Sequence, residues 1–254
     1  MAGETICCAD VTQDFWQGGK LSLRQLRHGQ RAGTDAALLA AAFTHLEGRL
    51  ADVGAGSGAV GLALAQRHSD VQVDLIDINA DLVALAVQNS ADNHLSDRVV
   101  AHCHDVLAGD DMKELQACYD VVVSNPPFYQ PERARAPRDR ARAQAHVLQG
   151  GSAEAWVRAC RKMLKPRGVL VMIHRPEALA AILVGLGQGG AGLRLMPLQP
   201  RSGAPANRII LRWQQGSRAP LCLLAPLVLH QASGAFTPEA DALHRGEATL
   251  ALEP

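Results

Sequence analysis

A glycine-rich turn stands where a predicted strand passes into a predicted helix. Residues 49–53 form a short, largely apolar run, and Gly54, Gly56 and Gly58 follow it directly. Glycines let the backbone turn tightly and pass close to a ligand held near the N-terminus of the next helix. Because Gly56, Gly58 and Gly61 also fit the G-x-G-x-x-G fingerprint, the turn alone does not exclude a dinucleotide cofactor.

Three carboxylates favour S-adenosylmethionine as the cofactor. Asp52 lies two residues before Gly54, where a negative charge would repel a pyrophosphate but suits a ligand with an amino group and a sulfonium. Asp77 ends the second predicted strand, where it can accept both ribose hydroxyls, and Asp105 ends the third, within reach of an adenine amine. The alternative is that Asp77 binds the N-terminus of the helix that follows it and that Asp105 is a turn residue. The predicted cofactor-binding residues here are Asp52, Gly54, Ala55, Gly56, Asp77, Ile78, Asp105 and Val106.

A proline-rich turn, Asn125-Pro126-Pro127-Phe128, follows the fourth predicted strand. Here the sequence resembles class I methyltransferases, which carry Asn-Pro-Pro-aromatic after strand four and modify amide or amino nitrogens. The resemblance implies that Asn125 and Pro126 supply two acceptor oxygens for an exocyclic NH₂, and that Asn125 also contacts the cofactor. The prolines stiffen the turn. Phe128 would stack on the target base or amide. A target base inside a structured region of RNA would have to be flipped out to reach it. The alternative is a rigid surface turn.

The flanking segments resemble the bacterial tRNA(Val) adenine N6-methyltransferase family. The matching stretches are 14–21 and 29–39, the loop positions Pro137, Arg138, Ala141, Arg142 and His146, and the closing segment 236–240. Gln30 departs from the family, which is expected to carry an aromatic residue there. The resemblance implies methyl transfer from S-adenosylmethionine to N6 of an adenine in tRNA.

The family resemblance also implies that Gly33, Thr34 and Asp35 close over the methionine end of the cofactor. The residues alone equally predict that Thr34 or Asp35 is the N-cap of a helix over 36–43. Alternative activities with the same proline turn are guanine N2 methylation of rRNA and glutamine N5 methylation of a release factor. A non-catalytic RNA-binding module and a nicotinamide oxidoreductase are the alternatives from other classes.

The predicted RNA-binding loop covers residues 129–149. Its substrate-binding candidates are Tyr129, Arg133, Arg135, Arg138, Arg140 and Arg142. Guanidinium groups bind phosphates through two parallel hydrogen bonds, and this loop directly follows the catalytic turn. Residues 125–218 as a whole carry 16 Lys and Arg against 4 Asp and Glu, which favours a nucleic acid as the partner, and the family resemblance implies that it is tRNA. The alternative is a solvated loop in a chain that simply favours arginine.

The hydrophobic pattern predicts an α/β, Rossmann-like fold. Strand-like runs at 49–53, 71–76, 99–103, 120–124 and 169–174 alternate with helix-like stretches at 58–68, 81–91 and 153–164. Such alternation indicates a mostly parallel sheet with helices on both faces, and the resemblance implies seven strands. Runs at 193–198, 208–213 and 221–229 predict an antiparallel C-terminal edge. We expect an N-terminal extension over 1–33, with a short β element at 20–26, and a methyltransferase domain over 34–254.

The composition excludes several other classes. With 254 residues, 48% of them hydrophobic, the chain can bury a full core, and global disorder is excluded. No apolar run approaches the roughly 20 residues that a membrane helix needs, and no export signal is visible at the start. His102-Cys103-His104 alternates on a strand, so no metal site is expected. Six scattered cysteines predict free thiols and a cytoplasmic protein. The oligomeric state is not predicted.

Overall fold

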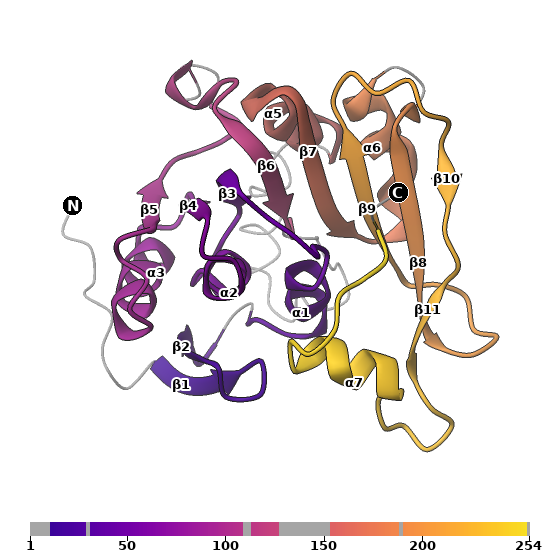
Figure 1. Cartoon of the computed structure of the whole chain (residues 1–254), viewed down its shortest axis with the longest axis horizontal. Coiled ribbons are helices and arrows are strands. Elements are labelled where there is room, and N and C mark those ends of the chain that lie inside the picture. The colour runs from indigo at the N-terminus through magenta and orange to yellow at the C-terminus, as the bar shows by residue number, and fades with distance from the viewer. Residues whose placement is uncertain (1–10, 29–30, 109–112, 127–152, 188–189, 253–254) are drawn as a thin grey trace, which may run out of the picture.

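The computed structural model describes residues 11–28, 31–108, 113–126, 153–187 and 190–252. Within them, the main sheet has nine strands in the order β10-β8-β9-β7-β6-β3-β4-β5, with β11 also beside β8 (Figure 1). Its strands are β3 (Gly48–Val53), β4 (Val71–Asp77), β5 (Val99–Cys103), β6 (Tyr119–Ser124), β7 (Leu164–His174), β8 (Leu193–Arg201), β9 (Arg208–Gln214), β10 (Cys222–Leu223) and β11 (Leu227–His230). A separate hairpin pairs β1 (Val11–Trp16) with β2 (Leu21–Leu26); β2 is the short β element predicted at 20–26, whereas β1 was not predicted.

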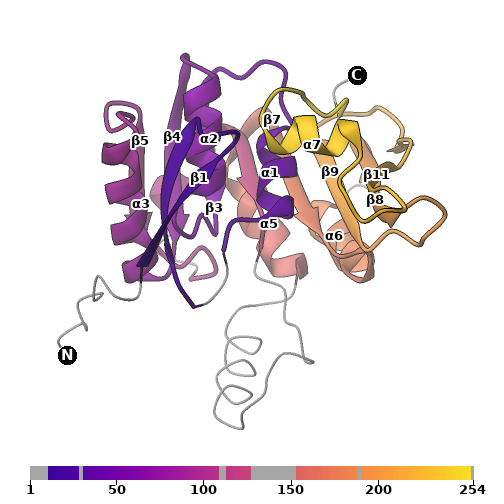
Figure 2. The same cartoon turned by 90° about the horizontal axis from the view of Figure 1, so that it is seen from below.

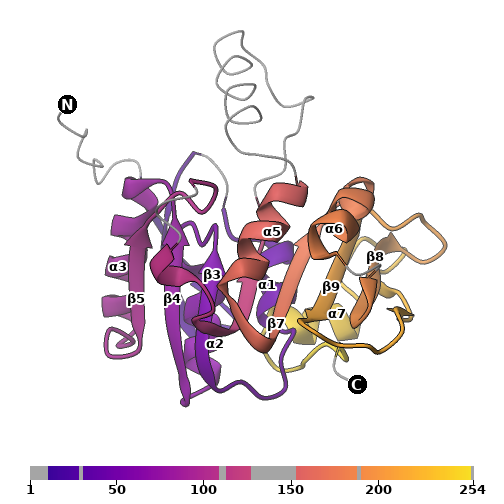
Figure 3. The ribbon, with the colours of Figure 1, turned by 90° about the horizontal axis from the view of Figure 1, so that it is seen from above.

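Helices cover both faces of the main sheet, as the alternating pattern predicted. The helices are α1 (Thr34–Ala40), α2 (Ala59–Arg67), α3 (Ala80–Asp92), α5 (Ala153–Met163), α6 (Leu179–Leu186) and α7 (Pro238–His244), with 3₁₀ turns at Lys113–Leu115 and Pro176–Ala178. The apolar core on one face includes residues of α1, α2, α3 and α7, whereas α5 and α6 pack on the other (Figure 3). The hairpin crosses the first face over α2 and α3 (Figure 2). No helix among the described residues is long and apolar enough to cross a bilayer.

The strand pairing confirms a mostly parallel sheet with antiparallel strands toward its C-terminal edge, and it corrects only the last strand predicted there. The neighbours β5-β4-β3-β6-β7 are all parallel, while β9 runs antiparallel between β7 and β8. The single strand predicted at 221–229 is instead two short strands, β10 and β11, which both run parallel to β8. Pro226 lies between them and lacks an N–H, so one continuous ladder cannot form there. These two strands raise the count above the predicted seven.

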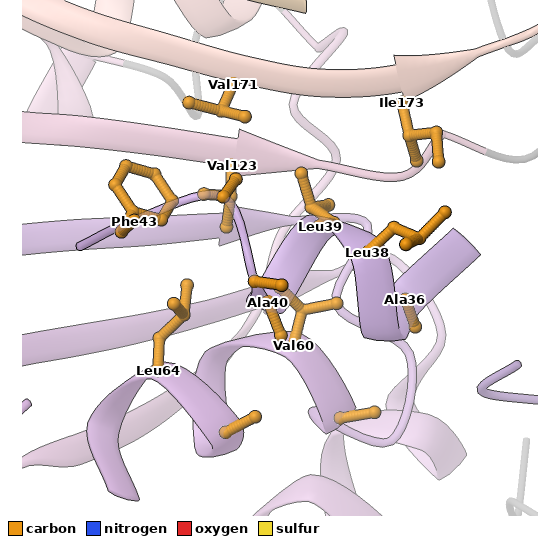
Figure 4. Close-up of a cluster of buried hydrophobic side chains, with 14 of the residues drawn as sticks. Ala36, Leu38, Leu39, Ala40, Phe43, Val60, Leu64, Val123, Val171 and Ile173 are labelled. Carbon is orange, nitrogen blue, oxygen red and sulfur yellow. The ribbon is translucent and has the colours of Figure 1, made fainter. Parts of the chain in front are cut away.

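Helix α1 lies beside α2 on the same face of the sheet, where it packs against β7 (Figure 1). Its residues from Ala36 to Ala40 are buried, and Leu38 and Leu39 point to strands β6 and β7 in Figure 4. The predicted cap is wrong: the N-cap is Gly33, and no side chain caps the helix. Asp35 cannot serve as the cap because it lies inside the first turn, where its carboxylate instead accepts a hydrogen bond from Arg208 Nε at 2.9 Å.

Helix α2 is packed against β4 so closely that residue 61 has no room for a side chain. A Cβ added to Gly61 would lie 2.3 Å from Leu75 Cδ2 and 3.0 Å from Val73 Cγ1, both on buried strand residues. We therefore expect Gly61→Ala to lower the free energy of unfolding by about 1–3 kcal/mol through overpacking. Urea unfolding followed by circular dichroism measures this loss. A Gly61→Ala midpoint equal to that of the native sequence would contradict the packing argument.

Candidate cofactor and active site

The carboxyl ends of β3, β4, β5 and β6 meet at one edge of the sheet and carry most of the predicted site residues. Val53 at the end of β3 is level with Ile76 on β4 and with Ser124 on β6. Asp77 at the end of β4 is level with Cys103 on β5. This register places the glycine turn, the residues after β4 and β5, and the proline turn side by side, at the edge that lies uppermost in Figure 3. Open parallel sheets bind ligands at this edge.

The turn after β3 is held to β4 by backbone hydrogen bonds and leaves one side open. The N–H groups of Gly54 and Ala55 both donate to Ile76 O, at 2.8 and 3.1 Å. Gly54, Gly56 and Gly58 all have positive φ, which explains why three glycines occur in five residues. A Cβ added at Gly56 would meet nothing within 4 Å. The turn thus offers a bare backbone surface, which fits the close approach of a nucleoside ligand.

Asp77 supports this turn directly. Its Oδ2 accepts the N–H of Gly56 at 2.8 Å, and its Oδ1 accepts the N–H of Asn79 at 2.9 Å. The cap of α3 is Asn79, which accepts N–H groups of that helix's first turn, so capping does not account for Asp77. Each carboxylate oxygen of Asp77 has a second lone pair, which leaves acceptors for the two ribose hydroxyls of the predicted ligand.

An exposed apolar residue adjoins Asp77 at this edge. Ile78 is 59% exposed, although its type favours burial. After β5, Asp105 Oδ1 accepts the N–H of Leu107 at 2.9 Å, so the turn role considered for Asp105 is present. Val106 is buried behind it. Ile78 offers a flat ring an apolar surface, while contacts of Asp105 and Val106 with an adenine stay predictions.

Asp52 lies beneath the glycine turn. It is only 2% exposed, and its Oδ2 accepts the N–H of Gly61 at 2.9 Å, which ties β3 to helix α2. Burial raises the pKa of Asp52 to about 7, with a smaller contribution from the neighbouring charge of Asp77 and an opposing one from the Gly61 hydrogen bond. A carboxyl group with this pKa favours a positively charged ligand, whose charge would stabilise the ionised form.

Asn125 presents an acceptor without a partner. Its Oδ1 is buried and has no hydrogen-bond partner among the residues that the structure describes. A buried acceptor without a hydrogen bond costs free energy, and a ligand that donates a hydrogen bond to it would recover that cost. Pro126, which follows, is buried as well. The two residues therefore fit the predicted role of receiving the hydrogens of an NH₂ group.

Ser124 and Trp156 connect the proline turn to the glycine turn through hydrogen bonds, and the sequence analysis did not predict this link. Ser124 Oγ donates to Val53 O at 2.7 Å and accepts the N–H of the Trp156 indole at 3.0 Å. The Trp156 ring also lies against the glycine turn, since a Cβ added to Gly54 would be 3.2 Å from Trp156 Cζ2. Nothing in the sequence around Trp156 indicates this polar partner.

The segment before α1 reaches the same edge. Its Gly33 is exposed, and Asp35 forms an ion pair with Arg208 at the start of β9. The preceding residues are held by the hairpin, where Gln25 Oε1 accepts the N–H of Ala32 at 2.7 Å. Closure of Gly33, Thr34 and Asp35 over a cofactor stays a prediction.

Several predicted residues lie outside the described residues. These are Pro127 and Phe128 of the proline turn and the loop residues Tyr129, Arg133, Arg135, Arg138, Arg140 and Arg142. The His102 and His104 rings share a face of β5 as predicted, with centroids 6.1 Å apart, and His102 Nε2 lies 2.8 Å from Asp74 Oδ1. In the parts of the chain that the structure describes, no group of three His, Cys, Asp or Glu side chains could hold a metal ion.

The fold and the site together define a methyltransferase of the Rossmann-like class. Residues 30–179 match the family model described as methyltransferase small domain. The chain belongs to this methyltransferase family. A solved structure, described as a predicted O-methyltransferase, Atu636, from Agrobacterium tumefaciens, has a TM-score of 0.70 and 30% identity over 85% of this chain and 98% of that one. The M. jannaschii TYW2 structure in complex with AdoMet, at 12% identity and a TM-score of 0.53 over 84% and 88% of the chains, shares the fold.

Curated relatives match over most of the chain. A protein of Aeromonas salmonicida is 31% identical over 216 residues, which are 83% of this chain and 87% of the relative. One from Photorhabdus laumondii is 27% identical over 84% of this chain and 86% of its own length. Both are named tRNA1(Val) (adenine(37)-N6)-methyltransferase. The sequence-based assignment to this family is confirmed.

Proposed function

We propose that the protein transfers a methyl group from S-adenosylmethionine to the N6 amine of an adenine in tRNA. The observation that carries the proposal is the buried Asn125 Oδ1 without a described partner, beside a glycine turn with an open backbone surface. The names of the curated relatives support tRNA adenine as the acceptor. The excess of basic residues over 125–218 supports a polyanionic partner.

The chain's own residues act mainly by positioning. Asn125 Oδ1 and the Pro126 carbonyl accept the two hydrogens of the amine, and this orients the nitrogen for attack. S-adenosylmethionine, when bound at this turn, would supply an electrophilic methyl group, and the electron pair of the broken carbon–sulfur bond would stay on its sulfur. The amine then loses one proton to solvent. Asp77, Ile78 and the glycine turn hold the nucleoside, so these residues fix the approach of the two reactants.

Three other acceptor groups compete with the adenine amine: a guanine amine, a glutamine amide and a hydroxyl group. Guanine N2 in rRNA and glutamine N5 in a release factor present the same planar nitrogen to Asn125. The solved relative from Agrobacterium is described as a predicted O-methyltransferase, and a hydroxyl acceptor has only one hydrogen to donate. The paired acceptors at Asn125 and Pro126 suit two hydrogens, which favours nitrogen.

The proposal is tested by identifying the methylated product. The purified protein is incubated with methyl-labelled S-adenosylmethionine and, separately, unmodified total tRNA, rRNA or release factor. Digestion and mass spectrometry then identify the labelled product. N6-methyladenosine from tRNA is the expected result. N2-methylguanosine, methylglutamine or a methyl ester or ether would contradict the acceptor, and no label in any substrate would contradict the activity.

The arginines of the 129–149 loop are proposed to contact the tRNA backbone. Replacing Arg138 and Arg142 together by alanine is expected to weaken tRNA binding and to lower the slope of log affinity against log salt by about 2, one for each lost phosphate contact. Filter binding across salt concentrations measures both quantities. Arg245→Ala serves as the control because Arg245 lies outside the basic stretch 125–218 and its guanidinium is paired with Asp241 and Glu247. An unchanged slope in the double variant would remove the loop from the interface.

A further inference from the structure

A buried amide on α3 joins the N-terminal hairpin to the glycine turn. Asn89 is 0% exposed, in the middle of a helix whose outer face meets solvent. Its Oδ1 accepts the N–H of Arg24 at 2.7 Å, and its Nδ2 donates to Arg24 O at 3.0 Å. The side chain thus pairs with both backbone groups of one β2 residue, as a neighbouring strand would. The same Nδ2 also donates to Ser57 O at 2.9 Å, inside the glycine turn.

Asn93, the C-cap residue of α3 and four positions after Asn89, makes the same contact with the hairpin without reaching the glycine turn. It accepts the N–H of Ser22 at 2.9 Å and donates to Ser22 O at 2.7 Å. Its second donor bond goes to the backbone O of Asn89 at 2.7 Å. Docking of β2 onto α3 therefore uses both asparagines, whereas only Asn89 adds a bond to Ser57. Substitutions at Asn89 and at Asn93 therefore distinguish an effect on the hairpin from an effect on the glycine turn.

The Ser57 carbonyl is a sensitive point of the turn. Ser57 stands between Gly56, whose N–H is bound by Asp77, and Gly58, which has a φ of 90° and is the N-cap of α2. Glycines on both sides leave the Ser57 peptide groups little intrinsic conformational preference. The bond from Asn89 fixes the direction of the Ser57 carbonyl, and with it the Gly58 N–H that donates to Ala55 O at 2.9 Å.

The hairpin also holds the other segment expected at the cofactor. Gln25, one residue after Arg24, is buried and binds the N–H of Ala32, directly before Gly33. Its Nε2 donates to Asp14 on β1 at 2.8 Å. Strand β2 is therefore bonded on one side to the segment that leads into α1 and, through Asn89, to the glycine turn.

We infer that Asn89 is a positioning residue of the cofactor site, which couples the hairpin β1–β2 to the glycine turn through its bond to Ser57. This inference rests on the proposed function only in that the ligand at the turn is the nucleoside cofactor. Asn89 does not touch the cofactor itself. It acts by holding the backbone that does, so its loss changes the affinity for the cofactor more than the affinity for the methyl acceptor.

The test compares two matched substitutions in the full-length protein. Asn89→Asp keeps an oxygen for the Arg24 N–H but places a second oxygen against the carbonyls of Arg24 and Ser57. Asn93→Asp makes the same change at the hairpin and leaves the glycine turn alone. Isothermal titration calorimetry with S-adenosylhomocysteine gives the Kd, and thermal melting gives the Tm of each protein. Because a buried aspartate can prevent folding, Asn89→Ala and Asn93→Ala are measured as a second pair.

We expect the Asn89 variants to bind S-adenosylhomocysteine at least about tenfold more weakly, and the Asn93 variants to stay within about twofold of the native sequence. Both pairs lower the Tm, since both lose hairpin contacts. In steady-state assays the Asn89 variants raise the KM for S-adenosylmethionine and leave the KM for the acceptor unchanged. An equal loss of affinity in the Asn89 and Asn93 pairs, or no loss at Asn89, would overturn the inference. If the native sequence itself binds no S-adenosylhomocysteine, the proposed function fails first.

Discussion

Asn125→Ala is expected to lower kcat by on the order of 10³-fold, while the protein still binds its cofactor. In the native sequence, Asn125 Oδ1 is buried, and no described residue donates a hydrogen bond to it. When an amine fills this position, its nitrogen is aimed at the methyl group, and removing the oxygen leaves the amine free to rotate. The glycine turn and Asp77 do not depend on this oxygen, because their hydrogen bonds run between β3, β4 and the residues after them. Methyl transfer under saturating conditions measures kcat, and calorimetry with S-adenosylhomocysteine measures binding.

A second variant separates the acceptor oxygen from the rest of the side chain. Asn125→Asp keeps an oxygen at the same position, so it is expected to lose less activity than Asn125→Ala. Equal Tm values for both variants would show that the loss is not one of folding. Activity of Asn125→Ala close to that of the native sequence would exclude the proposed role of Asn125, whatever the acceptor.

The central sheet and its rim could be predicted because their signals are local. The strands at 71–76, 99–103 and 120–124 are short Val-rich runs, and the structure places β4, β5 and β6 within one residue of each. A buried parallel strand is apolar on both faces, so its pattern depends little on its neighbours. The sequence signals of the turns are equally local, because closely spaced glycines and a pair of prolines are typical of turns.

The C-terminal part was harder because its signals are weak or depend on packing. Helix α6 has the sequence Leu-Ala-Ala-Ile-Leu-Val-Gly-Leu, which is apolar throughout and shows no helical period. Helix α7 was missed although Thr237-Pro238 is a recognisable helix start, with Thr237 Oγ1 accepting the N–H of Ala240 at 3.2 Å. Gly33 is the N-cap instead of Thr34 or Asp35, which both lie inside the first turn of α1, and the Asp35 carboxylate is bound by Arg208, 173 positions away in the sequence.

The supporting residues of the site could not be predicted at all. Ser124 and Asn89 act through hydrogen bonds to backbone carbonyls, and Trp156 through one to the Ser124 hydroxyl, and only the folded chain brings these partners together. Their types are common in helices and strands, and their spacing in the sequence carries no motif. Reasoning from the sequence therefore finds the groups that face a ligand, while the structure is needed to find those that hold them.

Cofactor affinity is expected to increase with pH through Asp52. Burial raises the pKa of Asp52 to about 7, so in the free protein this carboxyl group is largely protonated below that pH. A ligand with a positive charge favours the ionised form, and binding it below pH 7 must release the proton. By linkage, the affinity for S-adenosylmethionine falls about tenfold for each pH unit well below 7 and is roughly 20-fold weaker at pH 5.5 than at pH 7.5.

The stability of the cofactor-free protein is expected to change in the opposite direction. Because the folded pKa of Asp52 is raised above the unfolded value of 3.8, the folded state holds a proton that the unfolded state releases between about pH 4 and pH 7. The contribution of Asp52 to stability is therefore lost as pH rises through this window, and it is constant above it. Asp52→Asn keeps an oxygen for the Gly61 N–H without a titrating group, so both pH dependences are expected to flatten. Calorimetry and urea unfolding at several pH values, on both proteins, measure them. A native sequence whose cofactor Kd is the same at pH 5.5 and 7.5 would show that Asp52 does not sense the charge of the ligand.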